Sequence, residues 1–172
     1  MELKKIAIIG GGAAGFFAAI HAAEGKNEVH LFEKSNKLLS KVKVSGGGRC
    51  NVTHDCDHAN KLIQYYPRGG RSLKKGFEIF GTKDSKAWFE NRGVSLKIEG
   101  DGRVFPKSDS SQSIIDCLLN EANKKGVHIH LKKEVKTNIF LKPSSSLIRS
   151  EKIIYDDGYF VFEVGIKNAR SL

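Results

Sequence analysis

The residues best suited to chemistry by their type and spacing lie near the start of the chain. Gly10, Gly12 and Gly15 form a G-x-G-x-x-G pattern directly after the apolar run Lys5–Ile9. In this pattern the first glycine permits a tight turn, the second lets the main chain approach a pyrophosphate, and the third lets a helix pack closely on a strand. An acidic residue, Glu33, ends the next apolar run roughly 20 residues further on. The spacing predicts a dinucleotide-binding site.

The phosphates and the ribose of a dinucleotide are bound by different protein groups. A helix beginning near Ala13 and Ala14 would hold phosphates on its free N–H groups and at the positive end of its dipole. Glu33 would accept hydrogen bonds from a ribose 2′-hydroxyl, which argues against a 2′-phosphate at that position. The alternative is a glycine-rich turn between a strand and a helix that binds nothing. The flanking strand and helix patterns favour the binding site over this alternative.

These residues need a βαβ unit to position them. Residues 5–9 and 28–33 have the composition of short buried strands, and residues 13–24 carry apolar side chains at helical spacing. Gly25 stands where a glycine in the left-handed conformation often ends a helix. Glu33 then lies at the carboxyl end of the second strand, where open α/β sheets bind their ligands.

The remainder of the chain alternates helix and strand patterns. Thr82 is predicted to be the N-cap of a helix that Gly93 ends. A helix over 71–80, a hairpin of 94–98 with 103–106, a helix over 111–125 ended by Gly126, a strand over 127–131, an extended piece over 134–141 and a hairpin over 153–164 are also predicted. The predicted fold is α/β, with a Rossmann-like parallel sheet and an antiparallel β appendage.

A second glycine-rich stretch, residues 45–53, reads Ser-Gly-Gly-Gly-Arg-Cys-Asn-Val-Thr. Three consecutive glycines do not favour regular structure, because each has a high conformational entropy and offers no side chain for packing. They indicate main chain pressed close to a flat or charged group. The nearby Cys50, His54, Cys56 and His58 do not match a zinc-ligand spacing, so no metal site is predicted.

Composition limits the classes of partner. The 172 residues carry a formal charge of +10, which favours anionic ligands. The basic residues are scattered and accompany no nucleic-acid-binding motif, so no specific nucleic-acid partner is predicted. No apolar run is long enough to span a membrane. The first apolar run carries the glycine pattern, so it is predicted to be part of the fold and not a cleavable signal peptide. Three cysteines fit reduced thiols, and a cytoplasmic location is predicted.

Residues 45–53, together with Lys41 and a second block at 101–108 (Asp-Gly-Arg-Val-Phe-Pro-Lys-Ser), carry a family resemblance. The chain resembles the BaiN-like, or aminoacetone-oxidase-type, bacterial flavoproteins. Members have a Lys-x-x-x-Ser-Gly-Gly-Gly-Arg-Cys-Asn-x-Thr-Asn motif after an N-terminal Rossmann fingerprint. His54 departs from the last Asn of that motif, which affects only the role of this one side chain.

The resemblance implies FAD as the cofactor, with NAD(P)H as an electron donor to consider. It places the pyrophosphate on the first glycine loop, the adenosine ribose at Glu33, adenine near Val135, and the second glycine loop along the pyrophosphate and flavin. The implied cofactor-binding residues are Gly10, Gly12, Ala13, Ala14, Gly15, Glu33, Lys34, Lys41, Gly46, Gly47, Gly48, Arg49, Cys50, Asn51 and Val135.

Simpler roles stand beside two of these assignments. Arg49 could have the structural role of an ion pair with a nearby carboxylate and no role in cofactor binding. Cys50 could be a small buried apolar residue without a redox role. No catalytic acid, base or nucleophile is assigned.

Family members are longer than this chain, so residues 1–172 are expected to be the N-terminal part of an FAD/NAD(P)-binding domain. The substrate-side domain and the C-terminal segment that completes the flavin site are not among these residues. The predicted function is an FAD-dependent oxidoreductase of unknown substrate, represented by its FAD-binding portion. The alternatives are a non-catalytic dinucleotide-binding subunit whose partner is a separately encoded C-terminal half, and a fragment of an NAD-dependent dehydrogenase.

Overall fold

The computed structural model describes residues 4–135, 153–154 and 159–163. The chain divides into two compact units, one made of residues 1–40 and 118–172 and the other of residues 41–117. Among the described residues, no helix combines the length and apolar character needed to cross a membrane.

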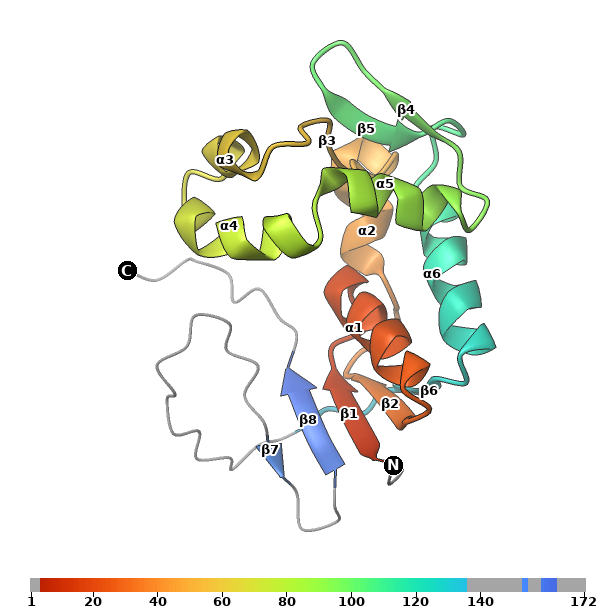
Figure 1. The fold of residues 1–172 in the computed structure, drawn as a ribbon. Helices are drawn as coiled ribbons and strands as arrows, with labels where there is room; N and C mark the ends of the chain where they lie inside the picture. The colour runs from red at the N-terminus through yellow and green to blue at the C-terminus, as the bar shows by residue number, and fades with distance from the viewer. Residues whose placement is uncertain (1–3, 136–152, 155–158, 164–172) are drawn as a thin grey trace. The chain divides into compact units, whose positions relative to one another are not determined.

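The first unit is built on a five-stranded sheet (Figure 1). Its strand order is β6-β2-β1-β8-β7, with bounds β1 Lys5–Ile9, β2 Glu28–Glu33, β6 His128–Leu131, β7 Ile153–Ile154 and β8 Tyr159–Glu163. β1 pairs in parallel with β2 and with β8, β2 pairs in parallel with β6, and β7 is antiparallel to β8. The predicted parallel sheet is confirmed. The predicted pairing within 153–164 is also confirmed, although the turn expected at 157–158 lies outside the described residues.

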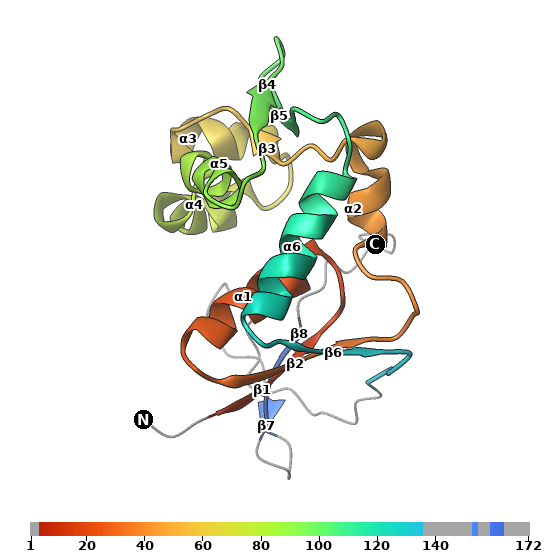
Figure 2. The same ribbon diagram turned by 90° about the vertical axis from the view of Figure 1, so that its right-hand side faces the viewer.

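Helix α1 (Ala13–Glu24) connects β1 to β2 and covers one face of the sheet (Figure 2). Phe16, Ala19 and Ile20 are completely buried on its inner side, opposite the buried strand residues Val29 and Leu31. This alternation of buried and exposed residues is the amphipathic pattern that the sequence predicts. The predicted βαβ unit is therefore present.

The end of α1 differs from the prediction in one detail. Gly25 has a φ of −79°, whereas the next residue, Lys26, adopts the left-handed conformation with a φ of 57°. The helix ends at the predicted place because the Lys26 N–H bonds to the carbonyl of Ala23. The left-handed residue is thus a lysine one position later than expected.

The second unit contains short helices and a small antiparallel sheet. Its elements are α2 (Ser40–Val44, beginning one residue before the unit), η1 (Ser45–Gly48), β3 (Thr53–His54), α3 (Ala59–Leu62), η2 (Ile63–Tyr65), α4 (Gly70–Ile79), α5 (Thr82–Glu90), β4 (Leu96–Ile98) and β5 (Arg103–Pro106). The sheet order is β3-β5-β4 with antiparallel pairs. The predicted hairpin is β4 with β5, and β3 is an addition that the sequence did not indicate.

The N-cap predicted for α5 is wrong by one residue. Thr82 is the first helical residue and is 2% exposed, and its hydroxyl donates to the carbonyl of Cys56 at 3.0 Å. Gly81 occupies the cap position, and its N–H donates to Asp84 at 2.8 Å. A hydroxyl that finds a partner elsewhere is not available to cap its own helix.

Helix α6 (Gln112–Lys124) begins in the second unit and ends in the first. Gly126, with a φ of 71°, follows it as predicted, and the Val127 N–H closes the end by bonding to Ala122. The extended piece predicted at 134–141 lies almost wholly outside the described residues.

Candidate cofactor site

The first glycine loop joins β1 to α1 in a tight turn. Gly10 has a φ of 107°, a conformation that favours glycine, and its N–H donates to the Phe32 carbonyl on β2 at 2.9 Å. A Cβ at Gly15 would lie 1.9 Å from the carbonyl oxygen of Gly10. Close contact between the helix and the strand end therefore depends on glycine at position 15, as the fingerprint predicts.

The start of α1 is open to a ligand. Gly12 is the N-cap of the helix, and a Cβ there would meet no atom within 4 Å. Gly12, Ala13 and Ala14 are all exposed. The first N–H groups of a helix lack intrahelical acceptors, so this end presents donors and a positive dipole end at an open surface. These features fit a pyrophosphate.

Glu33 lies at the carboxyl end of β2, against the glycine loop. Its two carboxylate oxygens accept the N–H groups of Gly11 and Ser35, each at 2.8 Å. Burial raises the pKa of Glu33, but the two backbone hydrogen bonds, the Ser35 side chain and the charge of Lys34 together lower the pKa below its ordinary value. A carboxylate has about four acceptor positions, so the ionised group retains capacity for ribose hydroxyls.

Gly11 is a site residue that the sequence reasoning passed over. A Cβ at this position would lie 2.7 Å from Leu38 and 3.1 Å from the Cβ of Glu33. The carbonyl of Gly11 also accepts the N–H of buried Leu39 at 2.8 Å. The signal was present in the sequence, because three consecutive glycines exceed the two that the fingerprint needs at these positions.

The first unit thus brings together the glycine loop, the start of α1, Glu33 and the adjacent exposed Lys34. Val135 is half-buried and follows β6 by four residues, in a segment with no regular structure. The strand expected around Val135 is therefore not formed at that residue.

The second glycine loop, which was not expected to form regular structure, is assigned to the short 3-10 helix η1, with non-helical dihedral angles at Gly46 and Gly47. Gly46, Gly47 and Gly48 have φ values of 55°, 69° and 84°, all in the region that favours glycine. A Cβ at Gly46 would lie 2.7 Å from the Asn51 nitrogen and 2.9 Å from the Phe105 ring. The loop is fastened to the start of α6, because Ser111 donates its N–H to Gly48 and its hydroxyl to Lys43.

Arg49 makes the ion pairs that the simpler role requires. Its Nη1 lies 2.5 Å from a Glu99 oxygen and 3.5 Å from an Asp109 oxygen, and its guanidinium sits 4.0 Å above the centre of the Phe105 ring. The hydrogen bond to Glu99 raises the pKa of Arg49. Sequence reasoning identified neither acid, since they lie 50 and 60 residues away along the chain.

Cys50 and Asn51 are held within the second unit. Cys50 is 8% exposed, and burial raises the pKa of its thiol despite a hydrogen bond with Ser45. A raised pKa disfavours the reactive thiolate. The Asn51 amide lies against the backbone of Thr53 and Val104, and in the orientation that satisfies its groups its nitrogen donates to the Thr53 carbonyl at 2.8 Å. Lys41 is exposed on α2.

The residues weighed as zinc ligands have other contacts. The His54 ring packs against Tyr65 with centroids 4.0 Å apart, and the Cys56 thiol lies 3.7 Å from the carbonyl of His58. Within the described part of the chain, they form no group of three or more gathered ligands.

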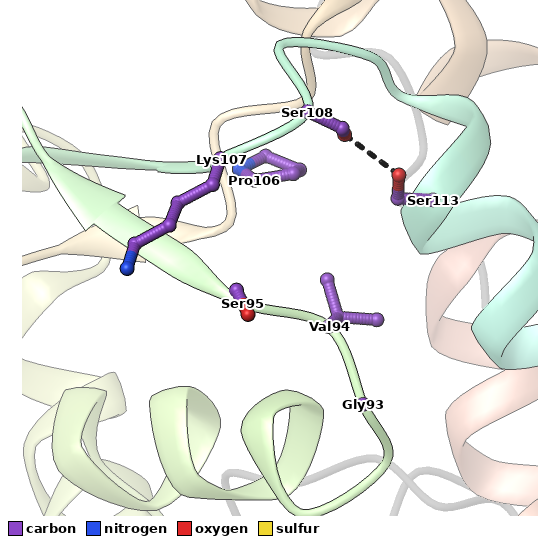
Figure 3. Close-up of a pocket in the computed structure, with 7 residues that line it drawn as sticks. All are labelled: Gly93, Val94, Ser95, Pro106, Lys107, Ser108 and Ser113. Atoms are coloured by element: carbon purple, nitrogen blue, oxygen red, sulfur yellow. Dashed lines mark hydrogen bonds between the residues drawn. The ribbon is translucent and has the colours of Figure 1, made fainter.

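The second sequence block, residues 101–108, borders a pocket of about 220 Å³ (Figure 3). Pro106, Lys107 and Ser108 form one side, and Gly93, Val94 and Ser95 form another. Ser108 reaches across to Ser113, with 2.7 Å between the hydroxyl oxygens. None of the predicted cofactor residues lines this pocket.

Comparison with known proteins agrees with these features. Residues 4–157 match the family model described as HI0933-like protein Rossmann domain. The chain is 29% identical over 172 residues to a 3-dehydro-bile acid delta(4,6)-reductase of Clostridium scindens, covering 99% of this chain and 41% of the relative. It is 29% identical over 164 residues to a ribosomal RNA dihydrouridine synthase of Escherichia coli, covering 92% and 40%.

A solved structure supports the same fold. An open conformation of a flavocytochrome c3 fumarate reductase superposes with a TM-score of 0.57 at 22% identity, covering 94% of this chain and 32% of the other. The chain spans about two fifths of the length of these two curated relatives. Because the family model matches most of the chain, the chain belongs to the HI0933-like Rossmann-domain family.

Proposed function

We propose that this chain holds the adenosine diphosphate part of FAD on its first unit. The supporting observation is that the start of α1, at Gly12, Ala13 and Ala14, is exposed. The ionised carboxylate of Glu33 lies next to this helix start, because it accepts the N–H of Gly11. The helix end would bind the pyrophosphate, and Glu33 would orient the adenosine ribose. Gly10, Gly11 and Gly15 would maintain the turn that presents these groups.

The family resemblance implies that further residues bind the same cofactor, and the proposal includes them. Lys34 would add positive charge near the phosphates, and Val135 would contact adenine. Lys41, the loop of Gly46, Gly47 and Gly48, and Arg49, Cys50 and Asn51 would serve the pyrophosphate and flavin. For Arg49 this role must compete with its ion pairs to Glu99 and Asp109.

We infer that the reaction is the reduction of an activated carbon–carbon double bond. The two relatives are named for a Δ4,6 reduction in a 3-dehydro-bile acid and for formation of dihydrouridine in ribosomal RNA. Both names describe hydrogen added to a double bond conjugated with a carbonyl group. FAD, when bound, supplies hydride-transfer chemistry. The residues of this chain would bind and orient the cofactor, and no general acid is assigned to them.

The remaining part of the functional protein would come from sequence outside these residues. The relatives are more than twice as long as the segment matched here. We propose that a C-terminal portion, joined to this chain or encoded separately, encloses the substrate. A cytoplasmic location is proposed with it, supported by three cysteines that are free thiols in the structure.

Thermal denaturation with added ligand tests the cofactor. FAD should raise the melting temperature of the purified chain in a concentration-dependent way, because a ligand that binds only the folded state stabilises it. NAD should raise it less. Stabilisation by NAD and not by FAD would favour the NAD-dependent dehydrogenase alternative.

A pair of variants separates the two roles of Arg49. If Arg49 serves the cofactor, Arg49→Gln should weaken FAD binding at least tenfold, while Glu99→Gln, which leaves the guanidinium in place, should not. Equal changes in melting temperature with unchanged FAD affinity in both variants would assign Arg49 to the ion pairs alone.

Reoxidation of the reduced flavoprotein tests the reaction class. A holoenzyme that includes this chain should be reoxidised by a 3-oxo-4,6-diene steroid or by uridine-containing RNA, and not by the saturated product of either. Reoxidation only by a substrate without a conjugated double bond would contradict the proposed reaction while leaving FAD binding intact.

A further inference from the structure

A cluster of imidazole and carboxylate groups lies on the first unit, away from the proposed cofactor site. Glu28 and His30 are on β2, and His128 and His130 are on β6. His30 and His128 are direct partners in the parallel register of the two strands. Alternate residues of a strand share one face, so all four side chains belong to the same face of the sheet.

The ligand-type atoms of this cluster are close together. One such atom from each of Glu28, His30 and His128 lies within 4.8 Å of the other two. The His30 and His128 rings are stacked, with centroids 4.8 Å apart, and His30 Nε2 is 3.0 Å from Glu28 Oε1. Lys5 contacts the other carboxylate oxygen, Oε2, at 3.7 Å, so Oε1 is the oxygen directed at the imidazoles.

His130 supplies what a metal-binding histidine needs from its surroundings. Its Nε2 lies 2.9 Å from Nδ1 of His30, the nitrogen that does not face Glu28. Histidine ligands of metals commonly donate their second ring N–H to a neighbouring acceptor, which fixes the ring and its tautomer. In this structure the two nitrogens already lie within hydrogen-bond distance, and the direction of their hydrogen bond depends on the tautomers of the two rings.

We propose that Glu28, His30 and His128 form a binding site for a divalent transition-metal ion of the zinc type, with His130 as the positioning residue for His30. Two imidazoles and one carboxylate are ligands that Zn²⁺ accepts, with a fourth position left for water or another ligand. Ligand atoms around a tetrahedral Zn²⁺ lie about 3.3 Å apart, given bonds of roughly 2.0–2.1 Å. Modest side-chain rotation would bring the three atoms from their present spacing to this one.

The site would be distinct from the proposed FAD site. Glu28 is the first residue of β2 and Glu33 is the last. Five steps along the strand, at about 3.3 Å each, separate the two residues by about 16 Å. An ion held by β2 and β6 would cross-link two neighbouring strands at the end of the sheet opposite the glycine loop. We expect its effect to be on the stability of this pairing.

Metal binding requires a specific proton rearrangement. Without metal, the Glu28 carboxylate can only accept, so Nε2 of His30 carries a proton. When both rings are neutral, Nδ1 of His30 then accepts from Nε2–H of His130. With Zn²⁺ on Nε2 of His30, the proton of that nitrogen leaves to solvent and His30 carries its proton on Nδ1, donated toward His130. His130 gives up its Nε2 proton to His30 and takes one from solvent on Nδ1, so the net proton count is unchanged.

The test uses the full chain without a histidine tag, freed of metal by a chelator and titrated with Zn²⁺ in a calorimeter. One Zn²⁺ per chain should bind to the wild type. His30→Gln and His128→Gln should each weaken binding by more than the roughly 10- to 100-fold expected for loss of an outer partner, and His130→Phe, which keeps the stacked ring, should weaken it within that range. Mg²⁺ should not compete, because it prefers oxygen ligands.

The matched control is His21→Gln combined with Glu24→Gln on α1. These residues form another His–carboxylate pair of the same unit, with 3.1 Å between His21 Nδ1 and Glu24 Oε2. The Zn²⁺ affinity of this double variant should be within about threefold of the wild type. That change is smaller than the roughly 10-fold or greater loss expected when a residue of a metal site is altered.

A measurement on the wild type keeps the test independent of how the variants fold. Imidazole nitrogen NMR should show His30 changing from the Nε2–H to the Nδ1–H tautomer when Zn²⁺ is added. The proposal is overturned if the wild type binds no Zn²⁺, if the cluster variants bind as tightly as the control, or if the His30 tautomer does not change.

Discussion

Single glycines of the first loop have different physical roles, although the fingerprint treats them as one motif. Gly15 is required by packing, since its Cβ would overlap the Gly10 carbonyl. Gly12 faces open space, so packing within the chain does not require glycine there. Gly11 leaves room for Leu38 and Glu33. Substitutions can therefore separate folding from binding.

Alanine at positions 12 and 15 should destabilise the chain to different extents. Gly15→Ala should destabilise the chain by about 1–3 kcal/mol, the usual cost of an overpacked site. Gly12→Ala should cost no more than about 1 kcal/mol, the scale of a changed N-cap. Urea denaturation of the two variants and the wild type measures this, and equal stability of the two variants would show that the packing explanation of Gly15 is incorrect.

The Glu33 carboxylate should contribute stability that depends on pH. Because its pKa in the folded chain lies below the ordinary value of 4.5, its contribution is complete above that value and is lost as the pH falls through the lowered pKa. Glu33→Gln leaves one backbone N–H without its acceptor and should cost about 1 kcal/mol at neutral pH.

Melting temperatures between pH 7 and pH 3 check this expectation. The difference between the wild type and Glu33→Gln should shrink on acidification. Glu24→Gln, which removes a carboxylate paired with His21 on α1, controls for the loss of one negative charge. A difference that stays constant down to pH 3 would argue against an ionised Glu33 in its two hydrogen bonds.

At the scale of elements, the second glycine loop owes its shape to three residues with positive φ. They differ in surroundings. A Cβ at Gly46 would collide with Asn51 and Phe105, whereas one at Gly47 would meet nothing within 4 Å. Both substitutions would carry the strain of a left-handed residue, and only one would add a collision.

Gly46→Ala should therefore destabilise the chain more than Gly47→Ala. Gly47→Ala should lose about 1–2 kcal/mol from left-handed strain. Gly46→Ala should lose more, because Asn51 or Phe105 must also move. Chemical denaturation gives both values, and a Gly46→Ala variant as stable as Gly47→Ala would show that the loop yields to the added atom.

The sequence predicted the elements of the first unit well because the signals were local. The apolar spacing of 13–24 and the alternation around 28–33 depend on neighbours within one turn or one strand. The conformations of Lys26 and Thr82 were not predictable in the same way. Thr82 prefers the Cys56 carbonyl 26 residues away to its own helix end, and such a partner is known only from the fold.

The site was predicted in part for the same reason. Gly10, Gly12, Gly15 and Glu33 follow from a spacing rule. The acids that pair with Arg49 come from the turn between β4 and β5 and from the segment before α6, and no spacing rule connects them to residue 49. The histidine cluster depends on the register of β2 with β6, which the sequence did not reveal.

At the scale of the whole molecule, the chain contains two compact units. The first presents a helix end and an ionised carboxylate at the carboxyl ends of parallel strands, the usual place for a dinucleotide. The second holds a glycine loop and an Arg49–Glu99 pair beside a small antiparallel sheet. The central claim is that the first of these arrangements binds FAD.

Fluorescence titration of FAD into the purified chain tests this claim most directly, with the wild type compared to Gly12→Ala. The account predicts saturable binding to the wild type and at least tenfold weaker binding to the variant, because the added methyl group occupies space that faces the ligand and not the protein. Equal FAD affinity of the two folded chains, or no FAD binding by the folded wild type, would contradict it.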